Sequence, residues 1–346
     1  MQGVRLTSLS HGGGCGCKLS PAVLEQIIAK SGGGLIPSDL LVGIETSDDA
    51  AVYRISEDQA IVATTDFFMP IVDDAFDFGR IAATNAISDI YAMGATPLFA
   101  LALVGMPIDK LPVQTIRQIL DGGESVCAAA GIPIAGGHTI DSVEPIYGLV
   151  AIGVVDPRNL KRNAGARPGD AIVLGKPLGV GIYSAALRKD ALDAAGYAAL
   201  RATTTKLNTP GIALGREPGA HALTDVTGFG LLGHLLEMCR ASSVGAVIDA
   251  AGVPLLPATR ALAERGFVTG ASGRNFAGYG ADVAFGASTH ATTRDILTDP
   301  QTSGGLLVAC APDRVDAVAA AFRADGFDDV AVIGEFVAGA PRVTVA

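Results

Sequence analysis

A short glycine-rich segment near the start of the sequence places two thiols beside a lysine, in the order Cys15-Gly16-Cys17-Lys18. A thiolate is a strong nucleophile, and a nearby ammonium group lowers the pKa of a cysteine. The glycines around the two cysteines would let the segment swing and bring sulfur to a partner. The pattern therefore predicts a mobile loop that carries a nucleophilic thiol.

Two other interpretations of this segment were weighed against the nucleophilic loop. With His11, the two cysteines could form part of a zinc site, but a closed site needs four ligands, and no second cluster of cysteine and histidine supplies them. A disordered tail with incidental cysteines is disfavoured, because two thiols, a lysine and several glycines fall within nine residues. The remaining three cysteines lie in apolar or helical stretches, as expected for small core residues in a reducing compartment.

A set of aspartates in apolar, glycine-rich surroundings forms the second candidate site. Asn85 and Asp89 are four residues apart on a predicted helix, so both project from one half-buried face. A polar pair on such a face needs a partner, and Mg²⁺ prefers a few carboxylates together with water and phosphate oxygens. Single aspartates are more often caps or surface charges, but the set favours a metal that neutralises charge in phosphoryl transfer. Its members are Asp48, Asp49, Asp66, Asp89 and Asp225.

Two glycine motifs are candidates for phosphate binding, although no P-loop pattern is present. The segment 228–233 matches the dinucleotide pattern G-x-G-x-x-G, with Asp249 at a plausible distance beyond. Three residues separate it from the preceding strand, and it falls late in the chain, so a dinucleotide site is disfavoured. Ala135-Gly136-Gly137-His138-Thr139 follows a predicted strand and is either a nucleotide loop or an ordinary tight turn.

The elements that must position these residues alternate between strands and helices in both halves of the chain. Ser20 and Pro21 are typical of a helix start. Strands are predicted at 60–65, 97–104, 132–135, 146–155, 171–175, 220–224, 304–310 and 330–336. Helices are predicted at 78–93, 113–130 (with an interruption at Gly122-Gly123), 180–187, 191–205, 231–239 and 313–324. This mixture indicates an α/β or α+β fold, with the polar segment 156–170 as the linker between two domains.

Length and charge exclude several classes of protein. The chain has 346 residues and a net charge of −10, and it contains no basic run of the kind that binds nucleic acid. No apolar run is long enough to cross a bilayer, and the polar start is unlike a signal peptide, so we expect a cytoplasmic protein without membrane contact. An anionic substrate would have to be attracted locally by lysines, backbone N–H groups or bound cations.

Seven motifs, in order from near residue 5 to near residue 335, resemble those of the selenophosphate synthetase family. They are 10–18 (SHGGGCGCK), 48–53 (DDAAVY), 64–68 (TTDFF), 83–89 (ATNAISD), 135–138 (AGGH), 224–230 (TDVTGFG) and 299–305 (DPQTSGG). The resemblance is far more specific than any one motif. It also explains the glycines of 228–233 as part of the Asp225 loop.

This resemblance implies the fold of the aminoimidazole-ribonucleotide-synthetase superfamily. A flexible catalytic loop (1–20) would precede an ATP-binding domain (21–156), which pairs with a second subunit through a shared β-barrel. An α+β domain (170–346) would follow. The implied reaction converts hydrogen selenide, ATP and water into selenophosphate, AMP and phosphate, supplying activated selenium for selenoproteins or selenonucleosides. The implied partners are the two substrates and a second copy of the chain, and the resemblance allows a selenium-delivery protein as a further partner.

The resemblance also assigns roles to individual residues. Cys15 matches the family's catalytic cysteine or selenocysteine, and Lys18 matches its essential lysine, which also contacts the nucleotide. Magnesium ligands are implied at Asp49, Asp89 and Asp225. Nucleotide contacts are implied at Thr46, Ser47, Asp48, Asp66, Asp89, Gly137, His138 and Thr139.

Two rival functions are weighed against this assignment. A related kinase, such as thiamine-monophosphate kinase, would share the aspartate-rich cleft but would have no use for Cys-x-Cys-Lys, and it would release ADP rather than AMP. A thiol-based carrier of selenium or zinc would bind its cargo without ATP and would leave the aspartates without a purpose.

Overall fold

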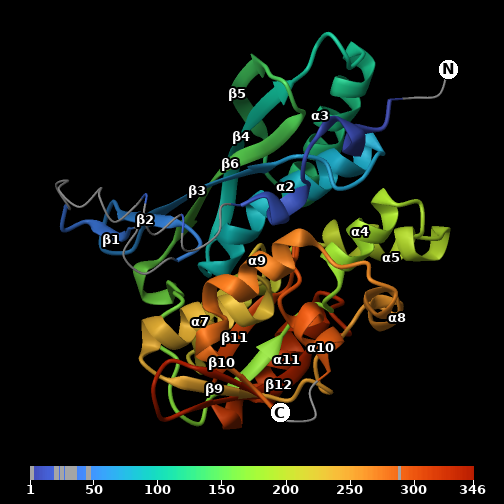
Figure 1. Ribbon diagram of the computed structural model, residues 1–346. Helices are drawn as coiled ribbons and strands as arrows, with labels where there is room; N and C mark the ends of the chain where they lie inside the picture. Colours follow the sequence, from blue (N-terminus) through green and yellow to red (C-terminus); the bar gives the residue numbers. More distant parts are fainter. Residues whose placement is uncertain (1–3, 19–22, 24–26, 28–36, 44–47, 287–289) are drawn as a thin grey trace.

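The structure is a computed structural model. It describes residues 4–18, 23, 27, 37–43, 48–286 and 290–346. The predicted helix after Pro21 lies outside these residues, apart from two isolated positions. The described residues form two sheets with helices packed against them (Figure 1), which confirms the predicted mixed α/β class. No helix in this part of the chain is both long enough and apolar enough to cross a membrane.

The first sheet has the strand order β1-β2-β3-β6-β4-β5, and β4 and β5 are its one parallel pair among the described strands. Helices α2 (Ala75–Ala92) and α3 (Val113–Ala129) lie on one face of it (Figure 1). The strands are β1 (Leu40–Val42), β2 (Ala51–Arg54), β3 (Ala60–Phe68), β4 (Thr96–Met106), β5 (Ile134–Asp141) and β6 (Ile146–Val155).

Glycines allow α2 and α3 to pack backbone against backbone. A Cβ atom added at Gly79 of α2 would lie 1.8 Å from the carbonyl oxygen of Ile119. One added at Gly122 of α3 would lie 2.1 Å from the carbonyl oxygen of Phe76. The predicted interruption at Gly122-Gly123 is therefore wrong: α3 is continuous, and its glycines serve close helix contact.

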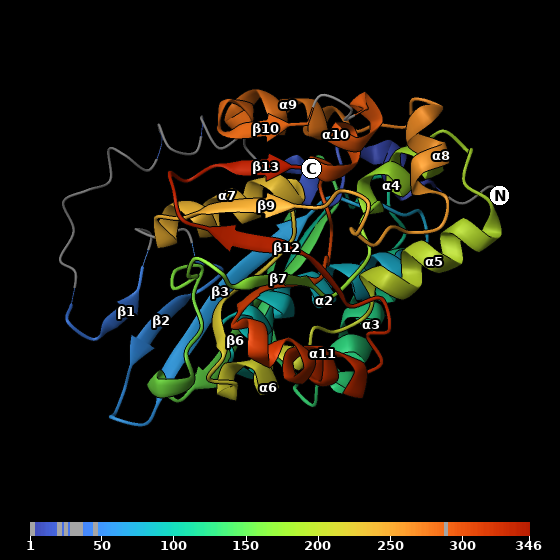
Figure 2. The same ribbon diagram turned by 90° about the horizontal axis from the view of Figure 1, so that it is seen from below.

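The second sheet has the strand order β10-β13-β9-β12-β7-β11-β8 and is largely antiparallel (Figure 2). Its strands are β7 (Ala171–Leu174), β8 (Ala220–Asp225), β9 (Gly245–Ile248), β10 (Val283–Phe285), β11 (Leu306–Cys310), β12 (Ala331–Val337) and β13 (Val343–Val345). The helices of this half are α4 (Val180–Arg188), α5 (Ala194–Thr204), α6 (Pro210–Arg216), α7 (Gly230–Ser242), α8 (Thr259–Glu264), α9 (Gly270–Tyr279), α10 (Ala291–Leu297) and α11 (Val315–Ala324).

Both faces of the second sheet are buried, which explains why its central strand β11 is apolar throughout. Side chains alternate between the faces of a strand. Leu307 of β11 packs into the cluster that contains α7, whereas Val308 packs into the cluster that contains α6 and α11. The chain crosses from the first sheet to the second through residues 156–170.

Two predicted element boundaries are wrong in ways that bear on function. Strand β3 continues to Phe68, so Asp66 lies inside the strand and pairs with Leu149 rather than following the strand end. The predicted loop or turn at 135–139 is part of strand β5. Glycine is needed there because a Cβ atom at Gly137, where φ is +153°, would lie 2.1 Å from the carbonyl oxygen of Ala102.

Candidate active site

Three carboxylates from distant parts of the chain meet between the two halves of the protein. Asp49 precedes β2, Asp89 lies near the end of α2, and Asp225 is the last residue of β8. One oxygen atom from each can be chosen so that all three lie within 4.8 Å of one another. The structure therefore brings together the three residues that were predicted to bind metal.

Each of these carboxylates accepts a hydrogen bond from a nearby hydroxyl group, which orients it. Asn208 supports this arrangement, because its side-chain nitrogen donates to Ser88 Oγ at 2.8 Å and to the carbonyl oxygen of Gly304 at 2.9 Å. The hydroxyl donors are Thr64 Oγ1 to Asp89 Oδ2 at 2.5 Å, Ser88 Oγ to Asp225 Oδ2 at 2.5 Å and Thr224 Oγ1 to Asp49 Oδ1 at 3.0 Å.

The electrostatics of the cluster fit a bound divalent cation. Burial, followed by repulsion from Asp225, raises the pKa of both Asp49 and Asp89 well above the usual range. Burial also raises the pKa of Asp225. The second carboxylate oxygen of Asp49 is buried and has no hydrogen-bond partner. A hard divalent cation bound by carboxylate oxygens would satisfy this atom and offset the repulsion.

The glycine-rich segment 11–18, which we call the glycine loop, docks its first thiol against helix α2. The side chain of Cys15 is buried, and its Sγ donates to Asn85 Oδ1 at 3.2 Å. The same oxygen accepts from the backbone N–H of Ser303 at 2.7 Å, and Asn85 Nδ2 donates to Asp66 Oδ2 at 2.7 Å. Thr302 also contacts Cys15, because its Oγ1 accepts from the backbone N–H of Cys15 at 3.1 Å. We call these contacts of Cys15 with Asn85 and Thr302 the dock.

Close contacts explain two of the glycines around this thiol. Gly14 has φ +55°, and a Cβ atom there would lie 2.3 Å from Thr302 Oγ1. A Cβ atom at Gly228 would lie 2.7 Å from the carbonyl oxygen of Cys15. The 228–233 motif thus borders the glycine loop, and Asp249 caps its own local turn by accepting from the N–H of Ala251 at 2.9 Å.

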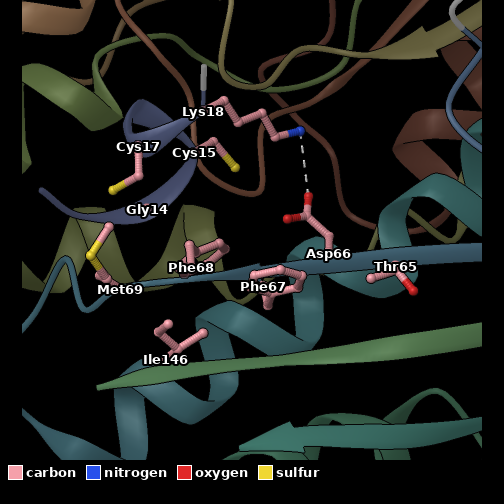
Figure 3. Close-up of a pocket in the computed structure, with 10 residues that line it drawn as sticks. All are labelled: Gly14, Cys15, Cys17, Lys18, Thr65, Asp66, Phe67, Phe68, Met69 and Ile146. Carbon is pink, nitrogen blue, oxygen red and sulfur yellow. Dashed lines mark ion pairs between the residues drawn. The ribbon is translucent and has the colours of Figure 1, made fainter. Parts of the chain in front are cut away.

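Lys18 crosses a cavity of about 390 Å³ to meet Asp66, with Nζ 3.6 Å from Oδ2 (Figure 3). The cavity is lined by the glycine loop, including both cysteines, and by the end of β3 around Phe67. Asp66 raises the pKa of Lys18, so the ammonium stays protonated. The structure therefore places the thiol, the ammonium and a carboxylate together in one cavity.

The surroundings of Cys15 keep its thiol protonated. Burial, and then the negative charge of Asp66, raise the pKa of Cys15 well above 9, although Lys18 acts in the opposite direction. Burial also raises the pKa of Cys17 to about 11. Lys18 does lower the pKa of the Cys15 thiol, as expected. Burial and the acidic neighbours raise this pKa by more, so the net shift is upward.

Within one chain, the nucleotide contacts predicted on β5 lie far from the carboxylate of Asp66. Gly137 shares a cross-strand row with Asp66, but three strand steps separate them, roughly 14 Å. His138 and Thr139 are exposed on this edge strand. Asp48 holds the interdomain segment through a 2.7 Å bond from the N–H of Asn163 to its Oδ1. The other two predicted contacts, Thr46 and Ser47, lie outside the described residues.

Several residues of the site were not predicted as such. Ser88 and Thr224 each precede a predicted metal ligand, and that adjacency was the available signal. Thr302 lies in a motif that had no assigned role. Asn208 had no local signal, since only the tertiary fold brings it to Ser88.

Two family models together match most of the chain. Residues 47–155 match the family model of the AIR synthase related protein N-terminal domain, and residues 167–346 match that of the C-terminal domain. A protein named selenide, water dikinase from Paraburkholderia xenovorans is 66% identical over 341 residues, covering 99% of this chain and 96% of that protein. One of the same name from Dechloromonas aromatica is 64% identical over 342 residues, covering 99% and 98%.

Solved structures share the fold at lower identity. A thiamine-monophosphate kinase from Stenotrophomonas maltophilia aligns with a TM-score of 0.64 at 24% identity, covering 94% of this chain and 95% of that one. The hydrogenase maturation protein HypE in complex with ATP aligns with a TM-score of 0.64 at 19% identity, covering 87% and 85%. These likenesses concern the fold alone.

Proposed function

The chain belongs to the AIR synthase related family and, within it, to the selenide, water dikinases, and from this premise we propose that it makes selenophosphate. Hydrogen selenide, ATP and water would give selenophosphate, AMP and phosphate. The observation that carries the proposal is the hydrogen bond from Cys15 to Asn85, because it holds a thiol against the helix that also carries Asp89 of the carboxylate cluster. A phosphate transfer to an oxygen acceptor would have no need of that thiol.

Magnesium is the cation we assign to the carboxylate cluster. Asp49, Asp89 and Asp225 would hold it, and their pattern of a few carboxylates fits the preference of Mg²⁺. When bound, the metal supplies neutralising charge for the phosphates of ATP.

The remaining roles fall to side chains of the glycine loop and its dock. Lys18 is the cation that orients the terminal phosphate or the anionic selenide, and Asp66 holds that ammonium in place. Cys15 presents the selenium for transfer, and Asn85 fixes the sulfur through its side-chain oxygen. The loop covers the site and excludes water while phosphate passes to selenium.

A second copy of the chain would complete the nucleotide site. The face of the first sheet opposite α2 and α3 carries exposed apolar side chains, which a dimeric β-barrel would bury. The exposed edge of β5, with Gly137, His138 and Thr139, would then contact nucleotide across the interface. The apolar residues on this sheet and its margin are Tyr53, Ile61, Phe67, Leu98 and Ile140.

The domain division stays part of the proposal: a catalytic loop at 1–20, an ATP-binding and dimerising domain at 21–156, and a C-terminal domain at 170–346. We also propose a cytoplasmic location, where thiols remain reduced.

Phosphorus NMR tests the function directly. The protein is incubated with ATP, Mg²⁺ and selenide under anaerobic reducing conditions. A selenophosphate signal, with AMP and phosphate in matching amounts, is expected. Intact ATP, or ADP as the sole nucleotide product, would overturn the proposal and favour a carrier or an ordinary kinase.

A further inference from the structure

A second cavity, of about 410 Å³, also borders the glycine loop and shares no lining residue with the Lys18–Asp66 cavity. Its walls come from Gly12, Gly13 and Gly16 of the loop and from helices α4 and α9. The first cavity is instead walled by the loop and β3. The glycine loop therefore borders two cavities whose other walls come from different elements.

The second cavity is lined by cations and by no carboxylate. Arg188 and Lys189 at the end of α4, and Arg274 of α9, all line it. None of the three forms an ion pair with any described residue. The chain as a whole carries a net charge of −10, so this concentration of unpaired positive charge selects for a small anion.

The cations are tied to the loop that carries the thiols. Arg188 Nη2 donates to the carbonyl oxygen of Gly12 at 3.0 Å, and Arg274 Nη2 donates to that of Gly16 at 3.2 Å. Thr302 lines the cavity and also accepts the N–H of Cys15. An anion in this cavity would therefore lie beside the loop that carries both thiols.

The other approach to Cys15 is electrostatically unfavourable for an anion. Asp66 and Asp225 act on the Cys15 thiol with negative charge, and Lys18, which is paired with Asp66, offsets part of it. Hydrogen selenide is largely a monoanion at neutral pH, so these carboxylates disfavour its approach from that side. The basic cavity offers an approach without that repulsion.

We propose that the cavity formed by Arg188, Lys189 and Arg274 binds the selenide monoanion and delivers it to the glycine loop. This assignment rests on the proposed function, because it names the place where that reaction's nucleophile enters. ATP and its metal would occupy the acidic side, and the selenium anion the basic side, of one loop.

Direct binding tests the proposal without relying on turnover. Selenide is equilibrated with the full-length protein under anaerobic conditions without ATP, and bound selenium is measured by elemental mass spectrometry after ultrafiltration. Lys189→Glu should raise the Kd for selenide about tenfold, and Arg274→Gln roughly threefold, as expected for partly screened charges. Lys110→Glu is the matched control, since Lys110 is exposed and lines neither cavity. Its Kd should equal that of the wild type.

Kinetics supply the second readout. In Lys189→Glu the KM for selenide should rise while the KM for ATP and the rate at saturating selenide stay near wild type.

Unchanged selenide binding in the double variant Lys189→Glu/Arg274→Gln would overturn the proposal. Displacement of selenide by inorganic phosphate at equal concentration would also overturn it, because the cavity would then be a phosphate site. If the wild type binds selenide through these residues but makes no selenophosphate, the proposed function fails and the cavity assignment stands.

Discussion

The sulfur of Cys15 lies 3.2 Å from the side-chain oxygen of Asn85, one helical turn before Asp89 on α2. That oxygen also accepts from the N–H of Ser303, and the amide nitrogen of Asn85 holds Asp66. One side chain thus joins the thiol, the lysine's carboxylate partner and the 299–305 segment to the helix that carries a metal ligand.

Asn85→Ala should release the glycine loop from the site. We expect selenophosphate formation to fall roughly a hundredfold, as misplacement of a reacting group by about 1 Å commonly does. The loss of the acceptor for the buried N–H of Ser303 should also lower the free energy of unfolding by about 1–3 kcal/mol. Activity assays beside urea unfolding separate the two effects. Full activity in a stably folded variant would show that the dock is dispensable.

Asp49→Asn should abolish metal-dependent ATP turnover, with a loss of at least about a hundredfold. The amide keeps the size of the side chain but removes one ligand charge. Binding of Mn²⁺, followed by electron paramagnetic resonance, should weaken in parallel. Asp121→Asn, on the exposed surface of α3, is the control and should bind Mn²⁺ normally. Equal Mn²⁺ affinity in the two variants would exclude Asp49 as a ligand.

The stability of the metal-free protein should fall as pH rises from about 5 to 8. The carboxyl groups of Asp49, Asp89 and Asp225 have raised pKa values in the folded state. The folded protein therefore binds more protons than the unfolded chain in this range, so raising the pH favours unfolding. Urea unfolding gives the free energy of unfolding of the wild type and of Asp49→Asn at both pH values. The value for the variant minus that for the wild type should be about 1 kcal/mol larger at pH 8 than at pH 5. Adding Mg²⁺ should stabilise the wild type more than the variant at pH 8, and equal stabilisation would contradict the assignment.

Asp66→Asn should lower the pKa of Cys15. The negative charge of Asp66 disfavours the thiolate, and its removal also frees Lys18 to act on the sulfur. The midpoint of the pH dependence of iodoacetamide labelling should move to lower pH. The same assay on Cys15→Ser measures the contribution of Cys17, which is subtracted. A midpoint that stays in place would mean that Asp66 has no influence on the thiol.

Asp299→Ala should destabilise the protein through the start of α4. The buried carboxylate of Asp299 accepts the N–H groups of Gly181 at 2.9 Å and Ile182 at 3.2 Å. Removing it leaves two buried donors unsatisfied, so the free energy of unfolding should fall by about 2–3 kcal/mol. Asp193→Ala removes the partly exposed cap of α5 and should cost only about 1 kcal/mol in the same urea titration.

Local patterns predicted the parts of the site that depend on residue type. The mixed fold, the glycine loop beside a lysine and a metal-binding set of five aspartates follow from residue chemistry in short segments, and the family resemblance narrows the set to Asp49, Asp89 and Asp225. The three aspartates do come together, although they are far apart in the chain. Their role as metal ligands stays a prediction.

What local patterns missed depends on tertiary distance. Asn208 reaches Ser88 only because the two halves pack together, and no spacing along the chain signals that contact. The glycines at 136 and 137 suggested a loop, but they lie in strand β5, where Gly137 approaches β4 too closely for a side chain. Burial, likewise, outweighs the expected effect of Lys18 on the pKa of the Cys15 thiol, and burial cannot be judged from adjacent residues.

The dock of Cys15 against Thr302 and Asn85 has a consequence for protein synthesis. Domains tend to fold in order as the chain leaves the ribosome, N-terminal part first. The glycine loop is made among the first residues, yet its partners extend to Ser303, and the third carboxylate comes from the end of β8. A partly synthesised chain therefore carries its thiols without a place to seat them. The seat of the thiol and the complete carboxylate cluster therefore require both halves of the protein.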